Sequence, residues 1–92
     1  MIVYRRGHDI DMIRLIELFE EAGYKDKTGD FNKLLNMVES SAEVITAWGF
    51  DYMIGFINSN GGEKAEYVLV DPEYSEMGID KELISRINSF GS

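Results

Sequence analysis

The sequence contains no cysteine, one proline and one histidine among its 92 residues. Without cysteine, the chain can form neither a disulfide framework nor a zinc site built on thiolates. A lone histidine leaves only carboxylates as further metal ligands, so we expect no metal site. The apolar start Met1–Val3 is too short for a signal peptide, and no run approaches the roughly 20 apolar residues of a membrane span. We therefore predict a cytoplasmic protein without a membrane contact.

Basic residues are also scarce, since 9 lysines and arginines stand against 17 acidic residues and leave a formal net charge of −8. This balance opposes the neutralisation of phosphates, so we expect no nucleic-acid partner. With 45% hydrophobic and 12% aromatic residues, the chain can build a core. The length of the chain predicts a single domain over 1–92. The core of such a domain is small, so we consider association with a partner as one way to stabilise it.

Apolar periodicity and turn residues predict the element order β-α-α-β-β-β-α. We expect strands at 2–6, 43–48, 52–58 and 64–70, and helices at about 10–22, at 31–40 and from 78 onward. Asp9 and Asp30 are the expected N-caps of the first two helices. Gly55 marks an expected bulge, and Asn60-Gly61 predicts a type I′ hairpin turn. The fold class is α+β of the three-layer α/β type, with a mainly antiparallel four-stranded sheet and helices packed on it.

The segment 68–84 carries most of the functional information. It joins a hydrophobic strand to Pro72-Glu73-Tyr74, a polar loop with Gly78, and an amphipathic helix. This succession resembles the acyl-CoA motif of the GCN5-related N-acetyltransferases, the GNAT superfamily. Residues 41–56 resemble the second and third strands of that superfamily, and the first strand and two helices resemble its opening unit. The resemblance covers nearly the whole chain and implies an acyl-CoA N-acyltransferase-like fold.

The resemblance further implies acetyl-CoA as cofactor and an unknown small amine or protein amine as acceptor. Amides at a turn and at a helix N-terminus can hold a pyrophosphate without side-chain charge, and the preceding strand can bond the pantetheine arm through its backbone. The resemblance assigns no catalytic residue. The implied cofactor-binding residues are Leu69, Val70, Ser75, Glu76, Met77, Gly78, Ile79, Asp80 and Lys81.

Two positions depart from the motif of the superfamily. Ser75 stands where the superfamily has Gln or Arg, and Asp80 stands where it has a second small residue. Glu76 and Asp80 thus place two carboxylates where a diphosphate should approach. At about 4 Å and an effective dielectric constant near 20, one like-charge pair costs about 4 kcal/mol before salt screening. We therefore expect weak cofactor binding or none, with Lys81 offsetting part of the repulsion only if it turns inward.

The sequence ends at Ser92, directly after the motif helix. Members of the superfamily continue with a parallel strand and commonly supply a tyrosine as general acid, so the resemblance implies a truncated domain that is inactive unless another molecule completes the cleft. The alternative is a noncatalytic interaction or oligomerisation module. If the strand at 64–70 lies at the sheet edge, its free backbone groups favour pairing with a second chain, which predicts a homodimer or higher oligomer.

Few other side chains suggest chemistry. Glu66 could act as a base through water, but an exposed strand carboxylate is the commoner case, and the base position of the superfamily falls on Lys64. His8 reads as a turn residue, and Tyr67 and Tyr74 as packing residues. Three acids of the first helix form either a solvated face or a surface that attracts a cationic amine: Glu17, Glu20 and Glu21.

Overall fold

A computed structural model of the protein describes residues 1–61 and 64–88. Its helices and strands follow the predicted order, and two short 3-10 helices, labelled η, are added to them. The elements are β1 (Ile2–Arg6), α1 (Met12–Glu21), η1 (Lys25–Lys27), α2 (Phe31–Ser40), β2 (Glu43–Gly49), β3 (Tyr52–Ser59), β4 (Tyr67–Val70), η2 (Pro72–Met77) and α3 (Ile79–Asn88).

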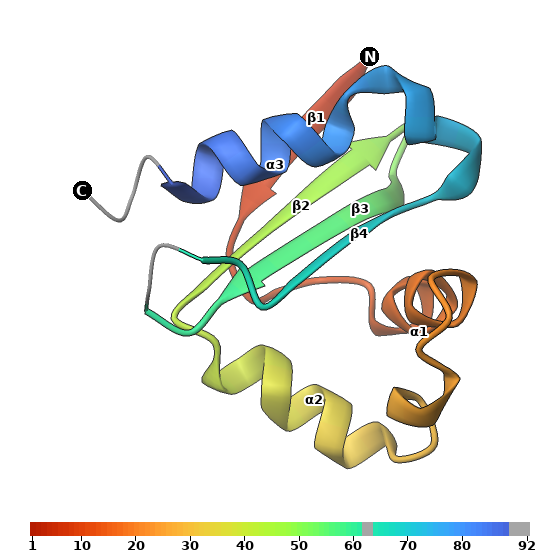
Figure 1. The fold of residues 1–92 in the computed structure, drawn as a ribbon, viewed down its shortest axis with the longest axis vertical. Coiled ribbons are helices and arrows are strands. Elements are labelled where there is room, and N and C mark those ends of the chain that lie inside the picture. Colours follow the sequence, from red (N-terminus) through yellow and green to blue (C-terminus); the bar gives the residue numbers. More distant parts are fainter. Residues whose placement is uncertain (62–63, 89–92) are drawn as a thin grey trace.

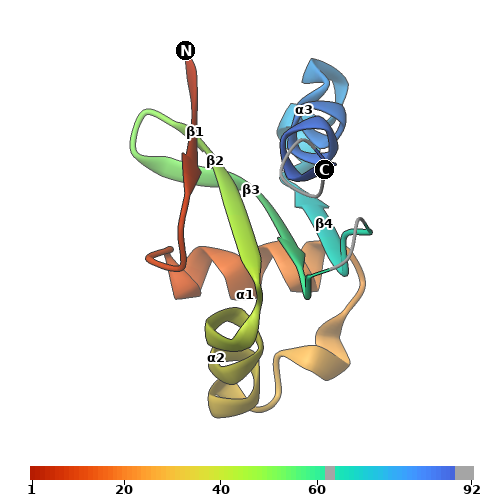
Figure 2. The same cartoon turned by 90° about the vertical axis from the view of Figure 1, so that its left-hand side faces the viewer.

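The strands form one antiparallel four-stranded sheet in the order β1-β2-β3-β4. Helices α1 and α2 lie on one face of this sheet, and α3 crosses the other face (Figure 1 and Figure 2). The predicted fold class, a four-stranded antiparallel sheet with helices packed on it, is therefore confirmed.

Each face of the sheet has its own hydrophobic core. The core under α1 and α2 consists of Leu15, Leu18, Phe19, Leu34, Val38, Val44, Met53, Phe56 and Leu69. The core under α3 consists of Ile45, Ala47, Ile54, Ile57, Ile79, Leu83 and Ile87. Both central strands supply residues to both cores, which explains why β2 and β3 read as nearly continuous apolar runs rather than as alternating ones.

The predicted bulge lies in β3 next to Gly55. Ala47 pairs with Gly55 and Trp48 pairs with Met53, so Ile54 has no partner on β2. The extra residue places Ile54 and Gly55 in succession on the α3 face, because a bulge interrupts the alternation of side chains. A Cβ atom at Gly55 would lie 3.1 Å from Cγ2 of Ile79, so the absence of a side chain here lets α3 approach the sheet.

The first helix begins later than predicted, and its N-cap is Asp11 rather than Asp9. The Asp11 carboxylate accepts a hydrogen bond from the amide of Arg14 at 3.1 Å. Either aspartate could cap a helix by its chemistry, and the apolar periodicity does not distinguish them since Ile10 packs on the same core from an extended segment. Asp30 caps α2 as predicted, by accepting from the amide of Lys33.

The expected type I′ turn at Asn60-Gly61 is wrong. Gly61 has a positive φ of 98°, but Asn60 does not. The two positive φ values of such a turn are found instead at Phe50 and Asp51, 53° and 68°, in the two-residue connection between β2 and β3. Pairing of β3 with β4 starts only at Asn58 and Tyr67, so the connection that contains Asn60 is longer, and Gly62 lies outside the described residues.

The fourth strand is shorter than the predicted 64–70. Asn58 accounts for its late start, because its carbonyl accepts from the amide of Glu66 and its side-chain oxygen accepts from the amide of Tyr67. Ala65 consequently packs with the α3 core and not on the face of Tyr67, where strand alternation had placed it. No helix in the described part of the chain is long and apolar enough to cross a lipid bilayer.

Candidate functional site

The connection from β4 to α3 forms a turn that is fixed at both ends. At its start, the Asp71 amide donates to the carbonyl of Ile54 at 2.8 Å, and the Asp71 carboxylate accepts from the amide of Glu73 at 2.9 Å. Pro72 occupies the first position of η2, where a missing amide hydrogen costs no bond. At its end, Gly78 adopts a left-handed φ of 72°, which glycine does without a steric penalty. Helix α3 therefore begins directly after this turn.

The amides at the start of α3 are available to a ligand. The first intrahelical bond runs from the amide of Glu82 to the carbonyl of Gly78 at 3.1 Å, so the amides of Ile79, Asp80 and Lys81 precede it. No atom lies within 4 Å of the place a Cβ would take on Gly78, so the space beside its backbone is open. A helix N-terminus with free amides and positive dipole potential suits an anion.

The predicted site residues of this turn differ in exposure. The Ile79 side chain is fully buried in the α3 core, and it anchors the turn rather than facing solvent. Gly78 is half-buried. The remaining side chains are exposed, and the carboxylates therefore lie in water: Ser75, Glu76, Met77, Asp80 and Lys81.

Strand β4 lies at the edge of the sheet, and no strand among the described residues pairs with its outer side. In an antiparallel ladder, pairs that exchange hydrogen bonds alternate with pairs that do not. The bond between Asp71 and Ile54 makes these two residues a hydrogen-bonded pair. By the alternation along the strand, the backbone groups of Leu69 also point toward β3, and those of Val68 and Val70 point outward. The outward groups on this edge thus belong to Val68 and Val70, whereas the sequence had suggested Leu69 and Val70.

Arg14 of α1 ties the end of β4 to the rest of the fold. Its side chain is only 6% exposed and donates from Nη2 to Asp71 at 2.9 Å, from Nε to the carbonyl of Met53 at 2.9 Å, and from Nη1 to Glu17 at 2.6 Å. The guanidinium also lies 4.0 Å from the ring centroid of Tyr52. Each donor group of the planar guanidinium is therefore used in holding α1, β3 and the start of the turn together.

Burial by itself lowers the pKa of Arg14, but its hydrogen bond to Glu17 and its electrostatic interactions with Tyr52, Glu17 and Asp71 outweigh this effect. The net pKa lies above the ordinary value of arginine. Arg14 therefore keeps its positive charge at neutral pH.

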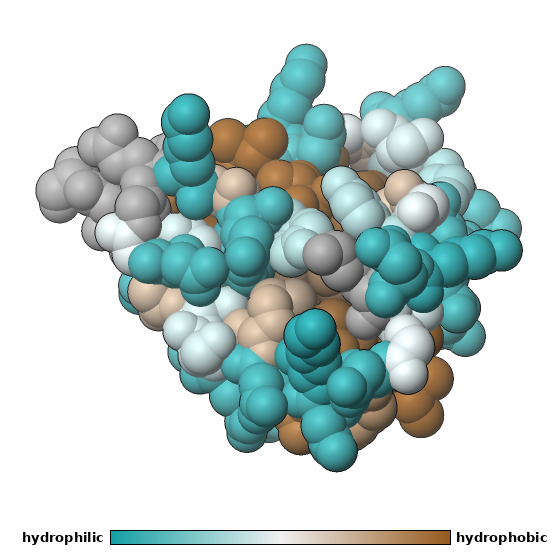
Figure 3. All heavy atoms as spheres, turned by 60° about the horizontal axis from the view of Figure 1, so that its bottom comes forward, coloured by the Kyte–Doolittle hydropathy of each residue, from teal (hydrophilic) through white to brown (hydrophobic). Residues whose placement is uncertain are grey.

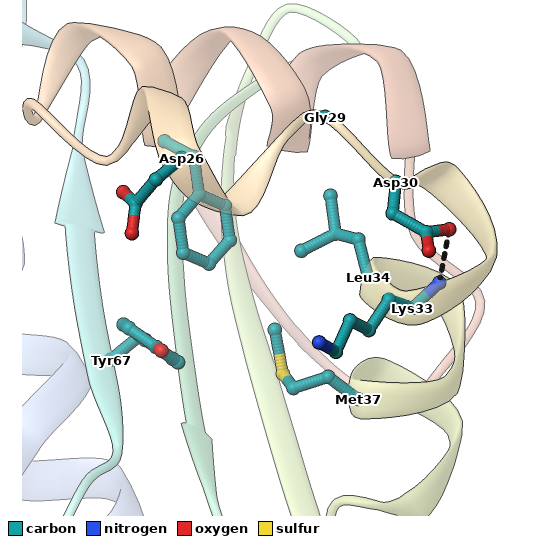
Figure 4. A pocket seen from close by; sticks show the side chains of 8 residues that line it. Asp26, Gly29, Asp30, Lys33, Leu34, Met37 and Tyr67 are labelled. Atoms are coloured by element: carbon teal, nitrogen blue, oxygen red, sulfur yellow. Dashed lines mark hydrogen bonds between the residues drawn. The ribbon is translucent and has the colours of Figure 1, made fainter.

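A pocket of about 460 Å³ opens between η1, α2 and β4 (Figure 4). Its walls combine aromatic, aliphatic and thioether groups with three charged side chains. The lining residues are Phe19, Asp26, Gly29, Asp30, Lys33, Leu34, Met37 and Tyr67. On the face that bears α2, polar and charged side chains surround apolar atoms (Figure 3). Tyr67 connects this pocket to β4, since it is the first residue of that strand.

A second, more open hollow of about 550 Å³ lies beside Arg14 and Tyr52. It is mostly acidic, with Lys25 as a further cation, and it includes the acids of the first helix that the sequence analysis singled out. Its carboxylates are those of Glu17, Glu20, Glu21, Asp71 and Glu73. Two of them are already bonded to Arg14, so the hollow is less negative than its count of acids suggests.

The other singled-out residues have structural surroundings. The Glu66 carboxylate accepts from the side-chain amide of Asn58 at 2.8 Å, and His8 Nε2 lies 2.7 Å from the carbonyl oxygen of Ser41. Lys64 is exposed, and Tyr74 packs against the α3 core. Among the residues that the structure describes, no cluster of three or more histidine, aspartate or glutamate side chains could hold a metal ion.

Comparison with solved structures identifies this arrangement. A GNAT family acetyltransferase from Streptococcus pneumoniae matches 94% of the chain with a TM-score of 0.74 at 19% identity. The PaiA N-acetyltransferase from Thermoplasma acidophilum, solved in complex with coenzyme A, matches 99% with a TM-score of 0.75 at 22% identity. An aminoglycoside acetyltransferase from an uncultured soil sample matches 98% with a TM-score of 0.75 at 23% identity. The chain has the GNAT acetyltransferase fold.

The match is one of structure and covers part of the GNAT proteins. The chain spans 64% of the S. pneumoniae protein, 72% of the T. acidophilum protein and 69% of the aminoglycoside enzyme. No protein-family model and no curated protein sequence matches it. The fold is therefore recognisable in the sequence only through local patterns, chiefly the strand, turn and helix at 68–84.

Arg14 and Val68 were not among the predicted site residues. Arg14 lies between apolar residues of α1, and the neighbouring sequence does not indicate that it pairs with Asp71, a buried residue 57 positions away. Val68 could have been found only by counting outward and inward positions from the ladder, which needs the register with β3. Asp71 did carry a signal, since an Asp-Pro step typically begins a turn.

Proposed function

We propose that the GNAT fold of this chain binds acetyl-CoA along the outer edge of β4 and at the N-terminus of α3, in support of N-acetyl transfer to an amine. The observation that carries the proposal is the turn from β4 through Gly78 into α3, which leaves consecutive amides free beside an open backbone. Such a turn suits the diphosphate of a CoA thioester. When bound, acetyl-CoA supplies an acetyl group activated as a thioester.

The residues of the chain fit this group mainly through their backbones. Val68 and Val70 would offer outward backbone groups to the pantetheine arm, and the amides of Ile79 to Lys81 would face the diphosphate. The Lys81 side chain is exposed and could reach an anion from outside the turn. Asp71, held by Arg14, would fix the start of the turn so that the amides keep their direction.

The carboxylates of Glu76 and Asp80 oppose an anion at this turn. Both are exposed, so water and salt screen them, and we expect them to weaken binding rather than abolish it. This observation also favours a second candidate, a noncatalytic module that keeps the GNAT fold as an interaction surface. The homo-oligomeric state and the cytoplasmic location stay predictions from the sequence.

Calorimetric titration with acetyl-CoA tests the proposal, with the oligomeric state measured by sedimentation on the same sample. We expect the double variant Glu76→Gln/Asp80→Asn to bind acetyl-CoA at least about tenfold more tightly than the parent chain, since relieving roughly 1.4 kcal/mol of repulsion gives that factor. The matched control is Asp9→Asn/Glu39→Gln, which removes two exposed carboxylates from other elements. It should change the dissociation constant by less than about twofold.

The opposite results separate the two candidates. Absence of heat and of a thermal shift in all three proteins would remove acetyl-CoA binding and leave the noncatalytic module. Binding that improves equally in the control variant would show that overall charge, and not the turn, governs the affinity.

A further inference from the structure

None of the residues that line the pocket between η1, α2 and β4 takes part in the proposed binding of acetyl-CoA. The volume of this pocket, about 460 Å³, lies in the range typical of small-molecule sites, about 300 to 1,000 Å³. Four separate parts of the chain form it: α1, the segment around η1, α2 and β4. A small molecule in it would therefore contact elements that are far apart in the sequence.

The inner wall of the pocket is apolar. Phe19 is 0% exposed and Leu34 is 4% exposed, and the flexible thioether of Met37 lies next to them. Tyr67 packs edge-on against Phe19 and Tyr24, with ring centroids 5.0 and 5.6 Å apart. These groups suit an aliphatic or aromatic side chain, because the aromatic cluster is held by its own contacts and methionine adapts to shape.

The rim of the pocket carries charges of both signs on different sides. Figure 4 shows the Asp26 carboxylate on the η1 side and the Lys33 ammonium group on the α2 side, with Leu34 and Met37 in the region between them. Asp30 uses one carboxylate oxygen to accept from the amide of Lys33 at 3.1 Å. Within the described part of the chain, neither the Asp26 carboxylate nor the Lys33 ammonium group has an ion-pair partner.

We propose that this pocket binds an apolar α-amino acid as its zwitterion. The ligand ammonium group would face Asp26, its carboxylate would face Lys33, and its side chain would lie on Leu34, Met37 and Tyr67. A simple alkylamine would leave Lys33 without a counter-charge, and a fatty acid would leave Asp26 without one. A molecule with both charges on one carbon and an apolar side chain satisfies both groups.

The location of the pocket connects it to the proposed acetyl-CoA edge. Tyr67 lines the pocket and begins β4, and the outward backbone groups of Val68 and Val70 follow on the same strand. The binding of an amino acid is argued from the pocket alone. Its role as the acetyl acceptor rests on the proposed function.

Calorimetric titration without acetyl-CoA tests the binding claim with L-leucine and two analogues. Leucinamide lacks the carboxylate and N-acetylleucine lacks the ammonium group, so each removes one of the proposed contacts. We expect leucine to bind at least tenfold more tightly than either analogue. In Lys33→Met the preference over leucinamide should disappear, and in Asp26→Asn the preference over N-acetylleucine should disappear.

Matched controls are Lys64→Met and Asp9→Asn, which remove an exposed lysine and an exposed aspartate outside the pocket. Both should keep the parent preferences, and circular dichroism should show that all variants fold. Equal binding of leucine and leucinamide to the parent chain, or no binding of leucine at millimolar concentration, would overturn the proposal whatever acetyl-CoA does. Leucine binding in a chain that fails to bind acetyl-CoA would keep the pocket and remove only the acceptor role.

Discussion

The ion pair between Arg14 and Asp71 is the single-residue feature on which we expect stability to depend most. The two side chains are 6% and 9% exposed, so removal of Arg14 leaves the buried Asp71 carboxylate without its counter-ion. We predict that Arg14→Met lowers the free energy of unfolding by about 3 kcal/mol, the range measured for broken buried pairs. Urea denaturation followed by tryptophan fluorescence measures this change, since Trp48 is the only tryptophan.

The control for this prediction is an exposed pair of similar geometry. Glu82 and Arg86 lie 2.8 Å apart and are both 46% exposed, so Glu82→Gln should cost less than about 1 kcal/mol. The double variant Arg14→Met/Asp71→Asn should be more stable than Arg14→Met alone, because no buried carboxylate remains unpaired. If the double variant loses the sum of the two single losses, then the ion pair does not couple these residues.

At the scale of elements, the approach of α3 to the sheet depends on Gly55. A Cβ there would lie 3.1 Å from Ile79 and 3.3 Å from both Ala47 and Leu83. We predict that Gly55→Ala lowers the free energy of unfolding by about 1 to 3 kcal/mol, the usual cost of overpacking a core. Because α3 carries the amides of the proposed anion site, the same variant should bind acetyl-CoA more weakly.

Gly49→Ala is the matched control, since it adds the same methyl group to the same sheet. Its Cβ would meet only Cδ1 of Ile54, at 3.6 Å, which is an ordinary contact. Thermal unfolding should therefore show little change for Gly49→Ala and a clear fall for Gly55→Ala. Equal melting temperatures would mean that α3 shifts outward without loss of packing.

The position of a helix, cap or turn could be predicted where a single local rule determines it. Helical spacing located α1 and α2, and the Asp30 cap was read correctly because Asp30 directly precedes Phe31, the first apolar residue of the helical pattern and of the helix itself. The cap of α1 was misplaced because Asp9 and Asp11 satisfy the same rule. The positive φ values at Phe50 and Asp51 follow from no local rule, because phenylalanine rarely adopts a positive φ and the hairpin register imposes it here.

The candidate site was predictable only in its local part. The turn around Gly78 follows from contiguous residues, and so do its free amides. The pocket beside Tyr67 unites residues from Phe19 to Tyr67, and no local pattern brings these together. The outward direction of Val68, like the burial of Arg14, depends on partners that only the assembled sheet supplies.

At the scale of the whole molecule, the net charge of −8 opposes any polyanion that approaches the turn at α3. Added salt usually weakens the binding of anionic ligands, because it screens attraction to basic groups. Here it should screen repulsion instead. We predict that raising the salt concentration from about 0.01 M to about 0.1 M, which shortens the Debye length from about 30 Å to about 10 Å, tightens acetyl-CoA binding severalfold.

The size of this salt effect shows whether the repulsion comes from the charge of the whole molecule or from the carboxylates of the turn. In Glu76→Gln/Asp80→Asn the net charge falls only to about −6 by loss of two carboxylates, so a salt effect from the whole surface should persist, whereas one from the turn should nearly vanish. Acetylated pantetheine, which lacks the phosphates, provides the ligand control and should bind independently of salt. Weaker acetyl-CoA binding at higher salt would instead mean that Lys81 and the helix amides dominate the potential at this turn, and the repulsion assigned to the acidic residues would be wrong.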